Sequence, residues 1–223
     1  MMELLKVGVI AGTFVDTQMG VEYLQKKGIQ ALGFPVSTSP EEQSQLQILS
    51  PVVLTELVRT IIKGIKEEGI GIVWVYCNSL SAAVNMDQLA EEEQVSLITP
   101  LTVYKRIAAN YQKIGILAAN NQSAAGIERV IQSVNPDCFV LGLGILPLVL
   151  QIEKGKSSQE IMQELGLDSI IDFFNTNLVD VLILGCTHFP YIKTALESLA
   201  TVPILDPADL MYELIISNEG ING

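Results

Sequence analysis

The sequence predicts an α/β protein of two similar lobes, each a doubly wound parallel sheet, related by internal duplication. Short apolar runs alternate with longer stretches at helical spacing, which is typical of βαβ units. Two segments recur 107 residues later (113 − 6 and 204 − 97): Lys6–Ala11 as Lys113–Ala118, and Leu97–Pro100 as Ile204–Pro207. Few polar residues interrupt the runs, so we expect helices on both faces of each sheet.

The apolar runs predict four strands in each copy. These lie near residues 5–10, 29–34, 70–76 and 95–98, and near 113–118, 138–143, 180–185 and 202–205. Helices are expected near 17–27, 55–68, 80–91, 101–110, 121–133, 157–175, 190–200 and 208–217. A further helix is predicted to begin at Ser39, where Pro40 and Glu42 complete an N-cap and capping-box pattern. It runs into the 50s, and Pro51 is a candidate interruption.

The last strand matches the fourth, which predicts how the chain divides. Because 202–205 resembles 95–98, the helix after it is expected to return to the first lobe. The chain then crosses between the lobes near Thr99 and Asp206, where we place a hinge. The predicted domains are residues 1–98 with 206–223, and residues 99–205.

Composition excludes several classes of partner. With 13 Lys and Arg against 25 Asp and Glu, the net charge is −12, the reverse of what phosphate backbones or an anionic membrane surface attract. No apolar run approaches the roughly 18 residues of a membrane span, and no signal peptide is recognisable, so we expect a cytoplasmic protein. The chain has three cysteines and one histidine, which argues against a zinc site; we expect no metal.

Two of the apolar runs end in a cysteine, Cys77 and Cys186, 109 residues apart (186 − 77). Small polar residues follow: Asn78 and Ser79 after the first cysteine, Thr187 and His188 after the second. Ligands of open α/β sheets bind beyond the carboxyl ends of strands, where the N–H groups of the next helix can hold a carboxylate. The same helix start favours the thiolate, which can abstract a proton.

The duplication predicts how the two thiols would work together. If the lobes face each other across a cleft, the thiols lie on opposite sides of a bound molecule. One would remove a proton and the other would return one to the opposite face. This arrangement favours racemisation over nucleophilic displacement, which would leave the second cysteine idle.

Structural alternatives remain for several residues. Cys138 is best read as a small hydrophobic core residue, and His188 as a ligand-site residue or a core histidine. Thr13, Asp16 and Thr17 follow the first strand; they either line the cleft or cap the next helix.

The motifs around the two cysteines resemble those of the cofactor-independent aspartate/glutamate racemases. The segment Gly185–Pro190 is nearly the glutamate racemase motif Gly-Cys-Thr-His-Tyr-Pro, whereas Cys77–Ser79 has Ser79 where the family usually has Thr. The likeness extends over the whole chain through strand order, duplication and length. It implies a two-lobe racemase that needs no pyridoxal phosphate or other cofactor, and a homodimer would fit it.

The resemblance also implies roles for individual residues. Cys77 and Cys186 would be the catalytic bases, with His188 assisting Cys186. The carboxylate and ammonium groups of the substrate would be held by Asn78, Ser79 and Thr187.

The chain departs from the family around the first two strands. Glutamate racemases carry Asp-Ser directly after the first strand, where this chain has Ala11–Thr13, and their Pro-Tyr-Gly loop is replaced by Pro35–Ser39. Aspartate racemases usually have an arginine near that loop, and none is present here. Thr13, Thr38 and Ser39 are candidate substrate contacts on position alone.

These observations favour an amino-acid racemase acting on aspartate or glutamate through two thiols. A hydantoin racemase also keeps both thiols and stays open, as do other isomerases of the superfamily. The arylmalonate decarboxylases use one cysteine, so the second cysteine argues against them. A non-catalytic protein that binds a small acid is the alternative from another class.

Overall fold

The computed structural model describes residues 5–37, 42 and 50–219. The chain divides into two compact units, one formed by described residues of Met1–Thr102 and Ala208–Gly223 and the other by Val103–Pro207. The helix predicted from Ser39 lies outside the described residues, apart from Glu42. A separate helix begins at Pro51, where the Ser50 side chain accepts a hydrogen bond from the Val53 N–H, so Pro51 starts a helix rather than interrupting one.

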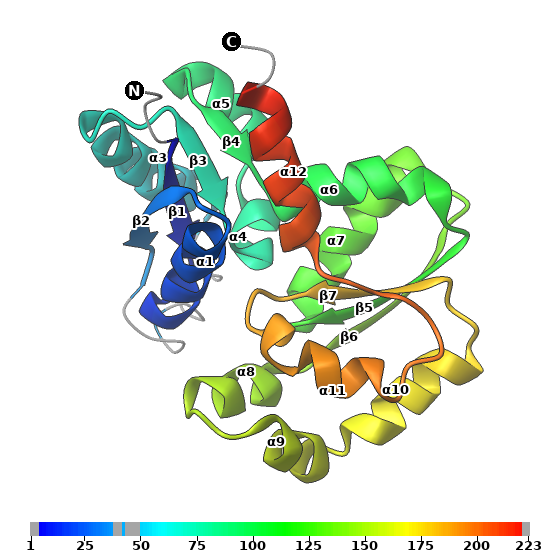
Figure 1. Cartoon of the computed structure of the whole chain (residues 1–223). Coiled ribbons are helices and arrows are strands. Elements are labelled where there is room, and N and C mark those ends of the chain that lie inside the picture. Colours follow the sequence, from blue (N-terminus) through cyan, green and yellow to red (C-terminus); the bar gives the residue numbers. More distant parts are fainter. Residues whose placement is uncertain (1–4, 38–41, 43–49, 220–223) are drawn as a thin grey trace. The chain divides into compact units, whose positions relative to one another are not determined.

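The first unit contains a four-stranded parallel sheet in the order β2-β1-β3-β4 (Figure 1). Its strands are β1 (Lys6–Ala11), β2 (Gln30–Pro35), β3 (Ile72–Val75) and β4 (Ser96–Ile98). In the central strand, Ile10 is paired with Phe34 of β2 on one side and with Val75 of β3 on the other. The carboxyl ends of β1, β2 and β3 therefore meet at one edge of the sheet.

The second unit repeats this sheet in the order β6-β5-β7-β8. Its strands are β5 (Lys113–Ala118), β6 (Phe139–Gly144), β7 (Val181–Gly185) and β8 (Ile204–Leu205). All three strand pairs are again parallel. The predicted α/β fold with two similar sheets is confirmed, and each predicted strand is found within about two residues of its expected bounds, the usual error at strand ends.

One predicted helix of the first unit is divided in the structure. The helices of this unit within the described residues are α1 (Phe14–Lys26), α3 (Pro51–Glu67), α4 (Asn78–Ala83), α5 (Met86–Glu93) and α12 (Pro207–Glu219), whose first residue belongs to the second unit. The single helix predicted near 80–91 is two helices, because the chain is extended at Val84 and the Asn85 side chain caps α5 by accepting from the Gln88 N–H at 3.2 Å.

The second unit contains one helix that the sequence reasoning missed. Its helical segments are α6 (Pro100–Ile107), which starts in the first unit, η1 (Ala108–Asn110), α7 (Asn121–Val134), α8 (Leu146–Glu153), α9 (Ser158–Leu165), α10 (Leu167–Thr176), η2 (Phe189–Ile192) and α11 (Lys193–Glu197). The missed helix is α8. The helix predicted over 157–175 is divided at Gly166, whose φ of 58° ends α9 in the left-handed region.

Apolar strands and helix faces form the core of each unit. Val9, Trp74 and Val75 in the first sheet are fully buried, as are Ile116 and Ile183 in the second. Helix α3 buries one stripe at helical spacing, formed by Leu54, Val58, Ile62 and Ile65. This burial explains why the strands read as continuous apolar runs.

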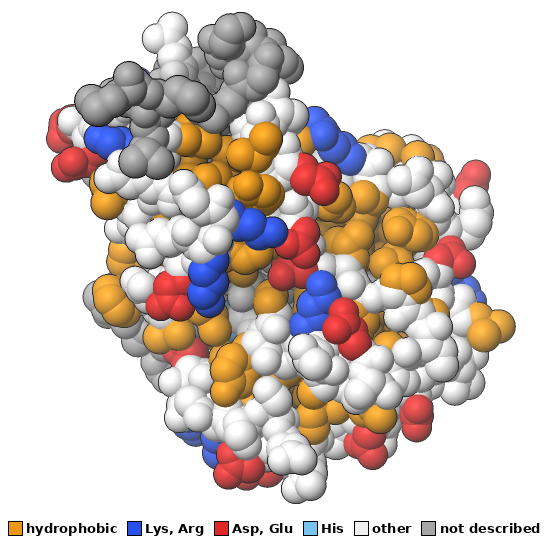
Figure 2. All heavy atoms as spheres, viewed as in Figure 1, with side chains coloured by type: hydrophobic (Ala, Val, Ile, Leu, Met, Phe, Trp, Pro, Cys, Tyr) orange, Lys and Arg blue, Asp and Glu red, His pale blue; other side chains and the backbone are white. Residues whose placement is uncertain are grey.

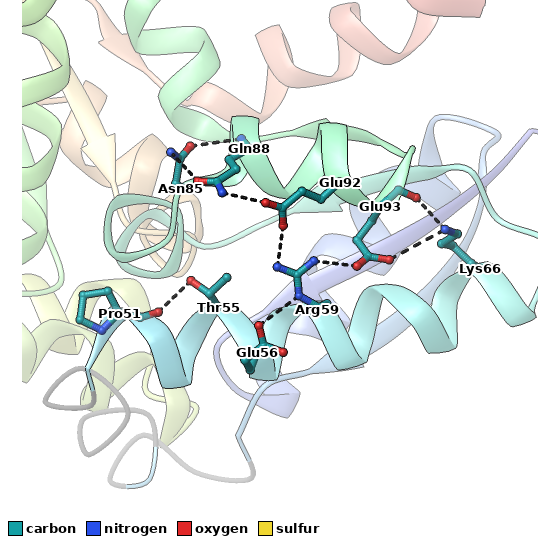
Figure 3. Close-up of polar contacts among 9 residues, drawn as sticks. All are labelled: Pro51, Thr55, Glu56, Arg59, Lys66, Asn85, Gln88, Glu92 and Glu93. Carbon is teal, nitrogen blue, oxygen red and sulfur yellow. Dashed lines mark hydrogen bonds and ion pairs between the residues drawn. The ribbon is translucent and has the colours of Figure 1, made fainter.

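A cluster of charges links α3 to α5 on the outside of the first unit (Figure 3). The Arg59 guanidinium donates to Glu93 at 2.8 Å, to Glu92 at 2.6 Å and to Glu56 at 3.2 Å. Lys66 Nζ donates to the carbonyl of Glu93 at 2.6 Å. The run of glutamates at 91–93 is thus partly engaged in a structural network.

The surface carries charges of both signs. On the face drawn in Figure 2, acidic and basic side chains stand singly or in small groups among apolar and uncharged ones. Among the described helices, none is long and apolar enough to cross a bilayer.

Candidate active site

Cys77 lies at the carboxyl end of β3, directly before the first turn of α4. Its side chain is 3% exposed, and its sulfur is 3.3 Å from the Ser79 hydroxyl. The Ser81 hydroxyl donates to the Cys77 carbonyl at 2.7 Å, which fixes the backbone at this point. Asn78 is buried beside it. The first predicted thiol therefore has a hydroxyl neighbour on its own turn.

The end of β1 lies beside Cys77 and is shaped by a buried carboxylate. The Tyr76 N–H donates to the carbonyl of Ile10 at 2.7 Å, which joins the two strand ends. The Asp16 carboxylate accepts from the N–H groups of Gly12 at 3.1 Å and Thr13 at 2.6 Å, and from the Thr13 hydroxyl at 3.0 Å. Thr13 and Asp16 form a capping box for α1, so the helix-cap interpretation of Asp16 is confirmed.

Ser37 continues this edge at the end of β2. Its N–H and hydroxyl both donate to the carbonyl of Gly12, at 2.9 and 2.5 Å. Thr38 and Ser39, predicted as substrate contacts, lie outside the described residues. The described edge of the first sheet thus runs from Ser37 through Thr13 to Cys77.

Cys186 occupies the corresponding place in the second unit, at the carboxyl end of β7. Its sulfur is 3.7 Å from Nδ1 of His188, and Nε2 of His188 is 2.9 Å from Oε1 of Glu153. His188 is 2% exposed and the Glu153 side chain 11%. With Nε2–H donating to the carboxylate, Nδ1 is an acceptor that faces the thiol. This arrangement lets the imidazole take the thiol proton.

Glu153 was missed because α8 was missed. It is the last residue of that helix, and its contact with His188 spans 35 positions of the chain. Leu148, Val149 and Ile152 are buried at helical spacing, and Pro147 stands in the first turn, a common place for proline. These signals predict the helix, but no local signal in the sequence pairs its last residue with His188.

The third cysteine lies apart from this chemistry. Cys138 stands directly before β6, at the amino end of the strand, and is 2% exposed. Burial raises the pKa of its thiol, and the charge of Asp180 raises it further. A buried thiol that resists ionisation is unreactive, which agrees with its interpretation as a core residue.

The described parts of the chain hold no group of three or more His, Cys, Asp or Glu side chains suited to a metal ion. The buried groups brought together are instead a thiol, hydroxyls and the Asp16 carboxylate in the first unit, and a thiol, an imidazole and a carboxylate in the second. Thr187, the residue between Cys186 and His188 in the sequence, is also buried. Each unit thus presents one thiol at the same edge of its sheet.

Comparison with known proteins supports one family. The family model described as Asp/Glu/Hydantoin racemase matches residues 28–215. A glutamate racemase of Limosilactobacillus reuteri is 27% identical over 180 residues, which cover 78% of this chain and 63% of the relative. The chain therefore matches less than two thirds of that relative's length.

Solved structures share the fold at low sequence identity. A glutamate racemase of Francisella tularensis, in complex with D-glutamate, superposes with a TM-score of 0.70 at 19% identity, over 96% of this chain and 82% of that one. An aspartate racemase of Picrophilus torridus gives a TM-score of 0.70 at 16% identity, over 97% and 94%. Both comparisons support the two-lobe α/β fold.

Proposed function

Because the chain belongs to the Asp/Glu/Hydantoin racemase family, we propose that it is a cofactor-independent isomerase that interconverts the enantiomers of aspartate or glutamate. The observation that carries the proposal is the repeated placement of a buried thiol at the carboxyl end of equivalent strands, Cys77 after β3 and Cys186 after β7. The relatives named glutamate racemase support the same reaction class.

The reaction needs one thiolate and one thiol on opposite faces of the substrate. The thiolate takes the α-proton, which leaves a planar carbanion, and the opposite thiol gives its proton to the other face. After one turnover the two sulfurs have exchanged protonation states, so the reverse direction uses the same pair. Proton transfer by such positioned groups typically contributes about a hundred- to ten-thousandfold to the rate.

His188 and Glu153 give Cys186 its proton acceptor. The imidazole nitrogen that faces the thiol can receive its proton, and Glu153 stabilises the imidazolium that results. The contacts at 3.7 and 2.9 Å support this role. Cys77 has the Ser79 hydroxyl in the equivalent position, and Thr13, which follows the adjacent strand β1, is held by Asp16.

The remaining assignments complete the proposal. The substrate's carboxylate and ammonium groups contact Thr13, Thr38, Ser39, Asn78, Ser79 and Thr187. Closure of two domains, residues 1–98 with 206–223 and residues 99–205, about the crossings at Thr99 and Asp206 excludes water from the carbanion. The enzyme works in the cytoplasm as a homodimer, on a free amino acid and without a cofactor.

The test is racemisation of each enantiomer of glutamate and aspartate, followed by chiral chromatography. We expect one of the two acids to reach an equal mixture of enantiomers from either side. Cys138→Ser is the matched control, because it changes a cysteine at the amino end of a strand rather than at a carboxyl end, and it should keep the activity. No racemisation of either acid would overturn the proposal, and activity on a hydantoin would favour the second branch of the family named by the matching model.

A further inference from the structure

The duplication places two buried polar residues at the same point of the two units. Asp16 on α1 corresponds to Ser123 on α7, at the repeat spacing of 107 (123 − 16). Each stands in the first turn of the helix that follows an inner strand of its sheet. Asp16 is 1% exposed and Ser123 is 2% exposed. The two positions therefore have the same setting but different side-chain chemistry.

The first turns of α1 and α7 make the same backbone bonds. The Asp16 N–H donates to the Thr13 hydroxyl at 3.4 Å, and the Ser123 N–H donates to Asn120 Oδ1 at 2.8 Å. In both units, the N–H of the next residue donates to the carbonyl of that capping residue at 3.1 Å. Because a helical side chain points back toward the start of its helix, Asp16 and Ser123 both reach over the first N–H groups of theirs.

The first unit holds a carboxylate at this place, and the second does not. Asp16 Oδ2 accepts from the Gly12 N–H at 3.1 Å, and Oδ1 accepts from the N–H and hydroxyl of Thr13 at 2.6 and 3.0 Å. The Ser123 hydroxyl is buried and has no hydrogen-bond partner among the residues that the structure describes. Buried hydroxyls are nearly always paired. This hydroxyl therefore indicates a ligand group at the place that the Asp16 carboxylate fills in the first unit.

Ser123 lies on the side of α7 that faces the strand of Cys186. Ile127 of α7 packs against Gly185 of that strand, since a Cβ on Gly185 would lie 2.7 Å from Ile127 Cδ1. Ser123 precedes Ile127 by four residues, so it lies on the same face of the helix and one turn nearer the carboxyl edge of the sheet. Cys186 is one residue nearer that edge than Gly185. The hydroxyl and the thiol thus belong to the same end of the second unit, and both are buried.

A carboxylate is the ligand group that this position fits. The first N–H groups of a helix attract anions, and the hydroxyl adds a donor beside them. Asp16 shows that the equivalent turn of this chain does hold a carboxylate. Under the proposed function, Asn78, Ser79 and Thr187 contact the groups on the α-carbon, so the remaining carboxylate of the substrate is that of its side chain.

We infer that Ser123 and the first turn of α7 bind the side-chain carboxylate of an acidic amino acid, and so set the preference for acidic over neutral substrates. The inference rests on the proposed function, because it takes the ligand to be an amino acid held beside Cys186. An amide of the same size presents an NH₂ group to the N–H donors of the helix and carries no charge, so it binds less well.

Two substitutions of Ser123 test the subsite. Ser123→Ala removes the hydroxyl and leaves the backbone of the turn in place. Ser123→Asp installs the residue of the first half, whose own carboxylate would occupy the place proposed for the ligand. Ser133→Ala is the matched control, because Ser133 is exposed on the same helix and donates to the Val130 carbonyl at 2.7 Å.

The measurement is isothermal titration calorimetry of the full chain with racemic aspartate, asparagine, glutamate and glutamine. Racemic ligands stay racemic during turnover, so the affinities do not depend on activity. We expect one acid to bind more tightly than its amide. Ser123→Ala should lower that preference by about tenfold or more, the value of a hydrogen bond to a charged group. Ser123→Asp should lower it further, because two carboxylates repel each other.

A smaller preference for the acid in both Ser123 variants, absent from Ser133→Ala, would support the inference. An unchanged preference in either variant would overturn it, as would equal losses of acid and amide binding or an unsubstituted chain that prefers neither acid to its amide. If Ser123→Asp fails to fold, Ser123→Ala decides alone. A chain that shows the expected shifts but racemises nothing would keep the subsite and remove the reaction, whereas racemisation with an unchanged preference would do the reverse.

Discussion

Cys77 and Cys186 occupy equivalent positions in two equivalent sheets, yet their neighbours differ in chemistry. Two residues after each cysteine, the first unit has the Ser79 hydroxyl at 3.3 Å and the second has the His188 imidazole at 3.7 Å. Only His188 continues to a carboxylate, that of Glu153. The difference teaches that the duplicated backbone sets where the thiols lie, while side chains specific to each unit set which polar group stands beside each sulfur.

The residue before each cysteine packs against the first helix of its unit, and the large and the small partner are reversed between the two units. Tyr76 stands before Cys77, and its ring packs against Gly20 of α1. A side chain at Gly20 would clash with that ring, because its Cβ would lie 2.8 Å from Tyr76 Cδ1. Before Cys186 stands Gly185, and the position equivalent to Gly20 is Ile127, whose Cδ1 would be 2.7 Å from a Cβ on Gly185. Strand and helix thus contribute one large and one small residue in each unit, in opposite order.

The largest effect is expected from removing either thiol. Cys77→Ser and Cys186→Ser should each lower kcat for racemisation by about a hundred- to ten-thousandfold, since a serine hydroxyl is a far weaker general base at neutral pH. Circular dichroism of the amino acid follows the rate. Full turnover in either variant would show that the two units do not share the reaction.

The next effect tests whether Cys186 depends on a carboxylate through His188, for which Cys77 has no counterpart in its Ser79 neighbour. Glu153→Gln keeps the shape of the side chain but removes the charge that stabilises a protonated His188, so kcat should fall about ten- to a hundredfold. Glu197→Gln is the control, because Glu197 lies on α11 in an ion pair with Lys193. Unchanged kcat in Glu153→Gln would mean that Cys186 needs no help beyond that available to Cys77.

A smaller effect, on stability, tests the packing of Gly185 against Ile127. Gly185→Ala should lower the free energy of unfolding by about 1–3 kcal/mol, because its Cβ overlaps Ile127 and approaches the Leu117 carbonyl. Gly64→Ala in α3 is the control: nothing lies within 4 Å of its new Cβ, so stability should rise by about 0.5–1 kcal/mol. Urea unfolding measures both, and equal effects would contradict the packing argument.

The smallest effect concerns the charge cluster of the first unit (Figure 3). Arg59 donates to the Glu92 carboxylate and, with Gln88, lowers its pKa. A carboxylate whose pKa is lower in the folded state contributes stability above its unfolded pKa, and this is lost as the pH falls through the folded value. Arg59→Gln should therefore lower the urea midpoint at neutral pH and low salt, and less so in acid or high salt. A pH-independent difference would mean that the Arg59 stem, not its charge, stabilises α3 against α5.

The strands could be predicted because their signals are local, and the duplication because matching segments recur along the chain. Parallel strands covered on both faces read as apolar runs, and the repeat spacing joins them into two sheets. The helices near Val84 and Gly166 were predicted as continuous, since one extended residue or one left-handed glycine leaves a weak trace in the pattern. The strand-end positions of Cys77 and Cys186 followed directly from the strands.

The partners of these cysteines could not be predicted in the same way. His188 was identified as a candidate because it stands in the Cys186 motif, but Glu153 reaches it from a distant helix. Asp16 was left open between capping and lining a site, and its bonds to Gly12 and Thr13 decide for the cap. Such choices depend on contacts made across the fold, which spacing along the chain does not encode.

The most direct test of two thiols serving one reaction is α-proton exchange in D₂O, followed by NMR with each enantiomer separately. In Cys77→Ser and Cys186→Ser, the remaining thiol should still exchange the proton of the one enantiomer that it faces, and the two variants should retain opposite enantiomers. Exchange of the same enantiomer in both variants, or inversion in either at the unsubstituted rate, would contradict the account.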